Sequence, residues 1–218
     1  MKHLILLLIF LPLFLDAQYI IRFAGNDTCG YSGDGGPAIN AMLSSPEGIY
    51  TDKAGNIYFA EWGTGHIRKV NPAGIISTIA GNASGIHSGD GGPATAAGLN
   101  QPVSVAVDKF GNVYIAEKFS YIRKVDSTGI ITTYAGNGMF SYGGDGGQAT
   151  AASFGMLSGL AVDTSGNVYI AEPMDNRIRI INSAGVITTF AGDGSLWYGG
   201  DGGPARFAQL ASVMSRMN

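Results

Sequence analysis

Four Gly-Asp-Gly-Gly loops hold the residues of this chain with the clearest potential for chemistry. An aspartate among glycines can bind Ca²⁺, help to cradle a phosphate, or accept hydrogen bonds that hold a turn. A phosphate site of the P-loop type would need a lysine, a Ser or Thr and a following helix, which the loops lack. Each loop offers one carboxylate, whereas Ca²⁺ takes roughly six or more oxygens. A structural role is therefore favoured, with calcium as the alternative, for Asp34, Asp90, Asp145 and Asp201.

An aromatic residue stands three positions before each of these aspartates. On loops that connect repeated units, such rings could line a rim and stack on sugars or on peptide side chains. The favoured alternative is that they pack against the neighbouring unit. The candidate ligand-binding residues are Tyr31, His87, Tyr142, Trp197 and Tyr198, with Phe140 close to the third of them.

Glutamate and arginine also recur at fixed positions, as Glu61, Glu117 and Glu172 and as Arg68, Arg123 and Arg179. The glutamates could surround a central axis or face solvent, and cross-strand pairing with carboxylates explains the arginines. Catalysis needs unlike groups in one place, whereas these groups repeat. His66 and His87 occupy different repeat positions, so a shared zinc site is not expected. No Ser-His-Asp or Cys-His set can be assembled, and we expect no catalytic residues.

The spacing of the aspartates, 56, 55 and 56 residues, shows which elements must position these side chains. Each interval contains four short apolar or alternating runs separated by turn residues, in the first interval 48–52, 57–61, 67–70 and 75–80. The 55-residue interval lacks one residue between Glu117 and Ile122. Short antiparallel strands without a helical period are typical of propeller blades. The sequence thus predicts an all-β propeller with four-stranded antiparallel blades, in preference to a parallel β-helix.

Several motifs at fixed spacing resemble the NHL repeat. In the second repeat they are Pro102–Asp108, Gly111–Glu117 and Ile122–Val125. Together with Gly-Asp-Gly-Gly-Pro-Ala and Ala-Gly-Asn, they are similar to the NHL propellers of teneurin-like and many bacterial exported proteins. The resemblance covers nearly all of the chain after residue 18, and it implies a ring of about six blades. Departures are small, such as Gln148 and Leu157 in place of prolines.

The phase of the repeat predicts where the propeller segment lies. We expect a signal peptide at 1–17 and a propeller segment at 18–218, with repeats at about 34–89, 90–144 and 145–200 and a partial fourth at 201–218. Residues 19–26 match a fourth, outer strand. We therefore expect about three complete blades plus an N-terminal outer strand, an incomplete ring. Such an arc would be a fragment or be completed by another chain, and its open blade edges could self-associate.

The N-terminus and the composition place the chain outside the cell. Lys2, the apolar run 4–15 and Ala17 form a signal-peptide pattern, and the run is too short to span a bilayer comfortably. An uncleaved anchor is the alternative. A net charge of −3 disfavours nucleic-acid binding, which needs a basic surface. Cys29 is the sole cysteine and predicts an accessible loop thiol.

These observations predict an exported, extracellular or periplasmic NHL-repeat propeller that is a fragment of a larger protein. It would act as a non-enzymatic scaffold for an unidentified protein or glycan, without nucleic acid and without a stable membrane span after signal cleavage. No cofactor is expected, with calcium as the alternative at the four aspartates. The competing function is that of a metal-dependent propeller enzyme like the gluconolactonases or lyases, which the fold resemblance also allows.

Overall fold

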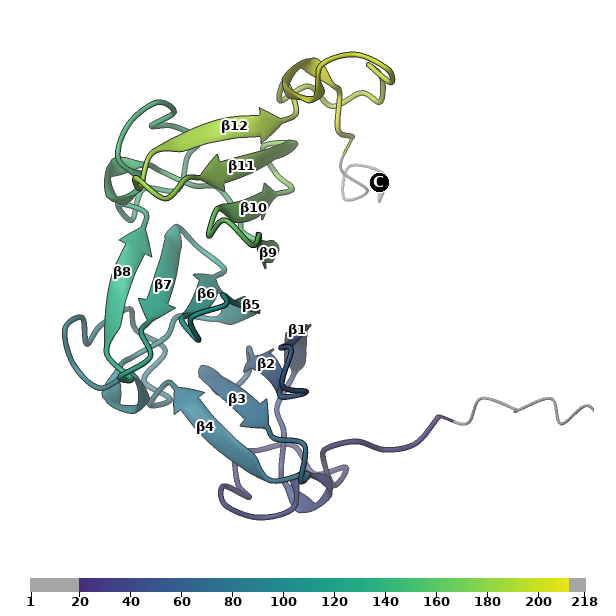
Figure 1. The fold of residues 1–218 in the computed structure, drawn as a ribbon, viewed down its shortest axis with the longest axis vertical. Coiled ribbons are helices and arrows are strands. Elements are labelled where there is room, and N and C mark those ends of the chain that lie inside the picture. Colours follow the sequence, from purple (N-terminus) through teal and green to yellow (C-terminus); the bar gives the residue numbers. More distant parts are fainter. Residues whose placement is uncertain (1–19, 212–218) are drawn as a thin grey trace, which may run out of the picture.

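The computed structural model describes residues 20–211, so the predicted signal peptide and residues 212–218 lie outside it. The described chain forms three four-stranded antiparallel sheets, which confirms the predicted blades (Figure 1). Blade 1 contains β1 (Pro46–Thr51), β2 (Ile57–Glu61), β3 (His66–Val70) and β4 (Ile76–Ala80). Blade 2 contains β5 (Pro102–Val107), β6 (Val113–Glu117), β7 (Tyr121–Val125) and β8 (Ile131–Ala135). Blade 3 contains β9 (Gly159–Val162), β10 (Val168–Glu172), β11 (Arg177–Ile181) and β12 (Ile187–Ala191).

The blades stand side by side in an open arc, with β1, β5 and β9 along its inner edge and β4, β8 and β12 along its outer edge (Figure 1). Four short 3₁₀ helices lie in the loops, at Ala38–Asn40, Ala94–Ala96, Ala149–Ala151 and Ala205–Phe207. No helix within residues 20–211 has the length and apolar character needed to cross a membrane.

Aspartates fix the first hairpin of each blade. In blade 2, Asp108 Oδ1 accepts hydrogen bonds from the N–H groups of Phe110 and Asn112, both at 2.9 Å. Its Oδ2 accepts another from Asn112 Nδ2 at 2.6 Å. Gly111 adopts φ +84°, a conformation that suits glycine in a tight turn. Asp52 and Asp163 make the same contacts in their blades, so the first two strands of every blade are joined by the same tight turn.

The hydrophobic core lies between the blades. At the joint between blades 1 and 2, one cluster joins side chains of β2, β3 and β4 to those of all four strands of blade 2 and the preceding loop. From blade 1 it takes Tyr58, Ala60, Ile67 and Ala80, and from blade 2 and its loop Leu99, Val105, Val113 and Ile115. The second joint is built in the same way between blades 2 and 3. Each blade is therefore stabilised mainly by its neighbours, as in other repeat proteins.

One local feature differs from the sequence-based expectation. Residues 20–26 form no strand, and Ile20 and Ile21 are exposed, so the predicted outer strand is wrong for this range. An outer strand needs a third strand beside it, and no described strand is available there. By contrast, the shortened turn after Glu117 is confirmed. It closes with Ser120 at φ +71°, where the longer turns use Gly65 and Asn176.

The Gly-Asp-Gly-Gly loops cover the outer edge of the following blade. Gly91 donates its N–H to the carbonyl oxygen of Ile131 in β8 at 2.8 Å. Ile131 in turn donates its N–H to the carbonyl oxygen of Gly92 at 3.0 Å. The edge strand is thereby paired and protected from other chains. Gly89 (φ +87°) and Gly91 (φ +79°) both need the left-handed region, but a Cβ on Gly89 would lie 2.7 Å from the Cα of Ala97, whereas one on Gly91 would meet open space.

This difference gives a matched test of loop packing. We expect Gly91→Ala to cost about 1 kcal/mol of unfolding free energy, from backbone strain alone. Gly89→Ala should cost at least 1 kcal/mol more, because the clash with Ala97 adds to the same strain. Urea unfolding monitored by circular dichroism would measure both. Equal losses would show that the loop does not pack as described.

Candidate functional site at the loop end of the blades

All the repeated polar residues singled out in the sequence gather at one end of the blades, here called the loop end. Antiparallel strands alternate in direction, so the second strand ends, the third begins and the fourth ends on this side. The loops between blades are therefore on the same side. The opposite side, with the β1–β2 and β3–β4 turns, is the hairpin end.

A buried glutamate–arginine pair occupies the loop end of each blade. In blade 2, Glu117 is the last residue of β6 and Arg123 lies in β7, and both side chains are completely buried. Arg123 Nη1 lies 3.4 Å from Glu117 Oε1. The corresponding distances are 3.0 Å in blade 1 and 3.3 Å in blade 3. Cross-strand pairing of the arginines is thus confirmed. The expectation that the glutamates ring an axis or face solvent is wrong, because the pairing removes them from water.

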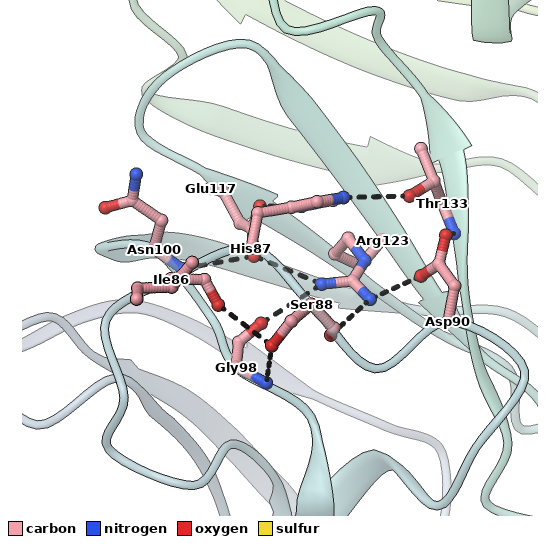
Figure 2. A network of polar contacts seen from close by, with 9 residues as sticks. All are labelled: Ile86, His87, Ser88, Asp90, Gly98, Asn100, Glu117, Arg123 and Thr133. Atoms are coloured by element: carbon pink, nitrogen blue, oxygen red, sulfur yellow. Dashed lines mark hydrogen bonds and ion pairs between the residues drawn. The ribbon is translucent and has the colours of Figure 1, made fainter.

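The loop aspartate binds the other side of the same guanidinium (Figure 2). Arg123 Nη2 lies 2.5 Å from Asp90 Oδ1 and donates to the carbonyl oxygen of Ser88 at 3.1 Å. Asp90 Oδ2 accepts the backbone N–H of Thr133 in β8 at 3.0 Å. The aspartate therefore does accept a backbone amide, but from the outer strand rather than from its own turn. We call this Glu–Arg–Asp arrangement the clasp, because it fastens each loop to the blade that follows.

The clasp is present in all three blades. Asp34 reaches Arg68 at 2.8 Å and Asp145 reaches Arg179 at 2.7 Å. Burial would raise the pKa of Asp145, but hydrogen bonds from Thr189 and the nearby charge of Arg179 outweigh it and hold that pKa below its ordinary value. Asp145 is therefore ionised near neutral pH, and its charge helps to balance that of the buried Arg179.

The aromatic residue before each aspartate completes the clasp. His87 stacks on Tyr121 with ring centroids 3.8 Å apart. Its Nδ1 lies 2.6 Å from Glu117 Oε2, and its Nε2 lies 3.1 Å from the hydroxyl of Thr133 (Figure 2). In this blade the histidine supports the glutamate and closes the site toward solvent.

Blades 1 and 3 fill the same place with other pairs of residues. In blade 1, Tyr31 of the loop stacks on His66 of β3 at 4.0 Å. In blade 3, the ring centre of Tyr142 lies 4.1 Å from the guanidinium carbon of Arg177. Both tyrosine hydroxyls reach a threonine of the outer strand at 2.9 Å. The geometry gives these aromatic residues a packing role, and ligand binding by Tyr31, His87 or Tyr142 stays a prediction.

The fourth loop repeats the local geometry without the arginine. Tyr198 donates its hydroxyl hydrogen to Asp201 Oδ2 at 2.5 Å, and Gly200 and Gly202 take positive φ as in the other loops. Within residues 20–211, Asp201 makes no ion pair. Trp197 and Tyr198 are exposed by 75% and 74%. They are the most accessible of the sequence-predicted ligand-binding residues.

Metal binding gains no support from this geometry. Three of the four candidate aspartates already contact a buried arginine. Within the described range, no three His, Cys, Asp or Glu side chains come close enough to hold an ion. His66 and His87 lie in different clasps, one stacked on Tyr31 and the other on Tyr121.

Sequence reasoning missed a group of unlike residues that joins neighbouring blades. Lys118 Nζ lies 5.6 Å from the ring centre of Trp62 and 5.7 Å from that of Phe119. Phe119 in turn contacts Phe140 edge to face at 5.8 Å. We call these four residues the loop-end patch. A signal was available, because the turn between the second and third strands is where the repeats differ: Trp62-Gly63-Thr64-Gly65, Lys118-Phe119-Ser120 and Pro173-Met174-Asp175-Asn176.

The four-stranded blades and the clasp define a β-propeller built from NHL repeats. The family model described as the Teneurin NHL domain matches residues 24–86, 83–143 and 139–201. The chain belongs to this teneurin NHL family, which confirms the resemblance seen in the sequence.

Curated relatives and solved structures agree with this assignment. Teneurin-3 of Mus musculus is 32% identical over 177 residues, covering 73% of this chain, and Teneurin-m of Drosophila melanogaster is 30% identical over 177 residues, covering 74%. The chain spans only 6% of the length of either relative. A protein of unknown function from Bacteroides thetaiotaomicron has a TM-score of 0.52 at 26% identity, over 62% of this chain and 35% of its own. An auxiliary nutrient binding protein from Bacteroides ovatus shares the fold. Its TM-score is 0.51 at 17% identity, over 79% of this chain and 41% of its own.

The clasp predicts a large stability loss when its arginine is removed. Arg123→Met should lower the unfolding free energy by about 3–5 kcal/mol, because Glu117 keeps a buried charge without its partner. Lys124→Met is the neighbouring control on the half-exposed side of β7 and should change it by less than about 0.5 kcal/mol. Thermal or urea unfolding would measure both. A small loss for Arg123→Met would contradict the role given to the clasp.

The third clasp has an unsatisfied oxygen and should be sensitive to pH. Burial raises the pKa of Glu172 to about 7, with Arg179 opposing the rise and Asp175 adding to it. The buried atoms Glu172 Oε2 and Asp175 Oδ2 have no hydrogen-bond partner among the described residues. In blade 1 the hydroxyl of Thr64, which stands where Asp175 stands in blade 3, lies 3.5 Å from Glu61 Oε2.

Asp175→Thr should therefore stabilise the chain at high pH. The folded-state pKa of Glu172 lies above its unfolded value, so its contribution to stability is full below about pH 4.5 and is lost as pH rises through about 7. Threonine removes the repulsive charge and supplies a donor. We expect a gain on the order of 1 kcal/mol at pH 8 and none at pH 5, measured by urea unfolding at both pH values. An equal gain at both would exclude the ionisation of Glu172 as its cause.

Proposed function

We propose that the chain is an exported, non-enzymatic binding module whose loop end takes up a protein ligand. The observation that carries this proposal is the loop-end patch, where unlike side chains from two blades meet at one place. The signal-peptide pattern at 1–17 supports export.

The repeated residues support a structural role for the clasps and a binding role for the residues that differ between blades. Glutamate, arginine and aspartate are engaged in the clasps, and the stacked aromatic rings cover them. The glutamates and arginines are completely buried, so a ligand could reach them only by opening the joint between blades. Residues free to recognise a ligand are those that vary from blade to blade, and a binding site grafted onto a repeat fold is expected at such positions.

The chemistry of the loop end favours a protein over a glycan. Ile86, Met139 and Leu196 at the loop tips are 68%, 65% and 62% exposed. Aliphatic and thioether side chains suit the apolar residues of a protein surface, and exposed apolar groups on loops mark interaction sites. Trp197 could stack on a sugar, so glycan binding is kept as an outcome of the test.

A selection from a displayed peptide library tests the proposal. Peptides selected on the intact chain should bind the variant Phe140→Asp at least tenfold more weakly, because the charge interrupts the loop-end patch. Phe110→Asp is the matched control, since Phe110 is 70% exposed but lies at the hairpin end, and it should bind as the parent does. A glycan array and a lactonase assay with and without EDTA run beside it. Glycan-only binding or chelator-sensitive turnover would contradict the proposed function.

A further inference from the structure

The two outward faces of the arc are the two halves of the joint that the chain makes twice within itself. Each joint has a donor face, made by the second, third and fourth strands of one blade, and an acceptor face, made by the strands of the next blade and the loop before it. In the first joint the donor face includes Tyr58, Ala60 and Ile67, with Ile79 packed beside them. The acceptor face includes Leu99, Val105, Val113 and Ile115.

Blade 1 presents an uncovered acceptor face. Strand pairing places Ile49 opposite Phe59 just as it places Val105 opposite Ile115, and Ile57 corresponds to Val113. Together with Leu43, which corresponds to Leu99, these residues line an apolar groove of about 390 Å³. Ile49 is 72% exposed, whereas Val105 in the closed joint is 2% exposed. The groove is therefore the place where a preceding blade would pack.

Blade 3 presents an uncovered donor face that matches the groove. Tyr169 and Phe190 form an edge-to-face pair at 5.1 Å. The corresponding pair in blade 2, Tyr114 and Tyr134, has the same geometry at 5.0 Å and is packed into the second joint. Phe190 is 48% exposed. The donor face is already arranged as in the closed joint, so docking requires little reordering of its side chains.

We propose that two copies of this chain assemble head to tail, with the donor face of blade 3 in one copy packed into the acceptor groove of blade 1 in the other. The occupant of the groove is defined by the chain itself, because the same pair of faces closes both internal joints. This interface lies between blades and does not involve the loop-end patch, so the inference goes beyond the proposed function and does not rest on it. Two such contacts between the same two copies would close a six-bladed ring, consistent with the four to eight blades of closed propellers.

One loop must be displaced from the joint for this assembly to form. Each internal joint contains a single loop, whereas the new joint would bring together the loop 25–45 of one copy and the loop 192–211 of the other. Asp34 fastens the first of these to Arg68 at 2.8 Å, while Asp201 of the second makes no ion pair within residues 20–211. The loop 192–211 is therefore the one displaced, and Asp201→Ala should leave assembly unchanged.

Two complementary variants of the full chain test the assembly. Size-exclusion chromatography with light scattering should give the parent a mass of two copies, and Ile49→Asp and Phe190→Asp, each alone, a mass of one copy. Ile86→Asp is the control, since Ile86 is 68% exposed on a loop tip and should leave the mass unchanged. Mixing Ile49→Asp with Phe190→Asp should restore a two-copy species, because the first keeps an intact donor face and the second an intact groove.

The mixing step also shows that both variants are folded, since an unfolded chain could not restore the joint. A parent chain of one-copy mass at all concentrations would overturn the proposal. So would association that survives either substitution, or two single-copy variants that fail to associate when mixed while Ile86→Asp still does. Loss of assembly on Asp201→Ala would also overturn it, because the displaced loop would then be part of the contact.

Discussion

Each blade buries an arginine that has no access to water and relies on two carboxylates for its charge balance. One carboxylate comes from the neighbouring strand and the other from the loop that enters the blade. Removing a guanidinium from water is costly unless its hydrogen bonds are replaced. This requirement positions the loop, holds the glutamate in the core and places the aromatic residue above both. The joints between blades, and hence the arc as a whole, depend on this local neutralisation.

The need to balance the charge of the buried arginines determines which residues have a structural role and which can recognise a ligand. Residues that recur with the repeat are used to balance charge and to fill the joints, so they are not free to bind anything else. The glutamate, arginine and aspartate of the clasp are the same in all three blades, whereas the turn after the second strand and the loop tips differ from blade to blade. The loop-end patch arises there, where Lys118 lies between the rings of Trp62 and Phe119. A repeat protein can thus change its ligand without changing its joints.

The clasps also show how one structural problem is solved with different residues. The outer oxygen of the buried glutamate contacts Arg68 and Thr64 in blade 1 and His87 in blade 2. In blade 3 it has no hydrogen-bond partner among the described residues, and the charge of Asp175 acts on the glutamate. The stacked pair exchanges tyrosine and histidine between blades 1 and 2. The glutamate–arginine–aspartate contacts are kept while the surrounding residues differ. In blade 3, Glu172 Oε2 is buried without a hydrogen-bond donor among the described residues, and burial together with the charge of Asp175 raises the pKa of Glu172.

The sequence alone determined the fold, because the repeat spacing, the hairpin aspartates and the alternation of apolar residues are local properties of the chain. It located the shortened turn after Glu117 and the pairing of the arginines for the same reason. Only the tertiary structure decided which carboxylate meets which arginine, since Asp90 and Arg123 are 33 residues apart and their contact depends on the path of the loop. It also showed that residues 20–26 form no strand, and that unlike side chains from blades 1 and 2 form one patch. Those outcomes depend on which segments lie side by side in the folded chain. The spacing of residues along the sequence does not specify this.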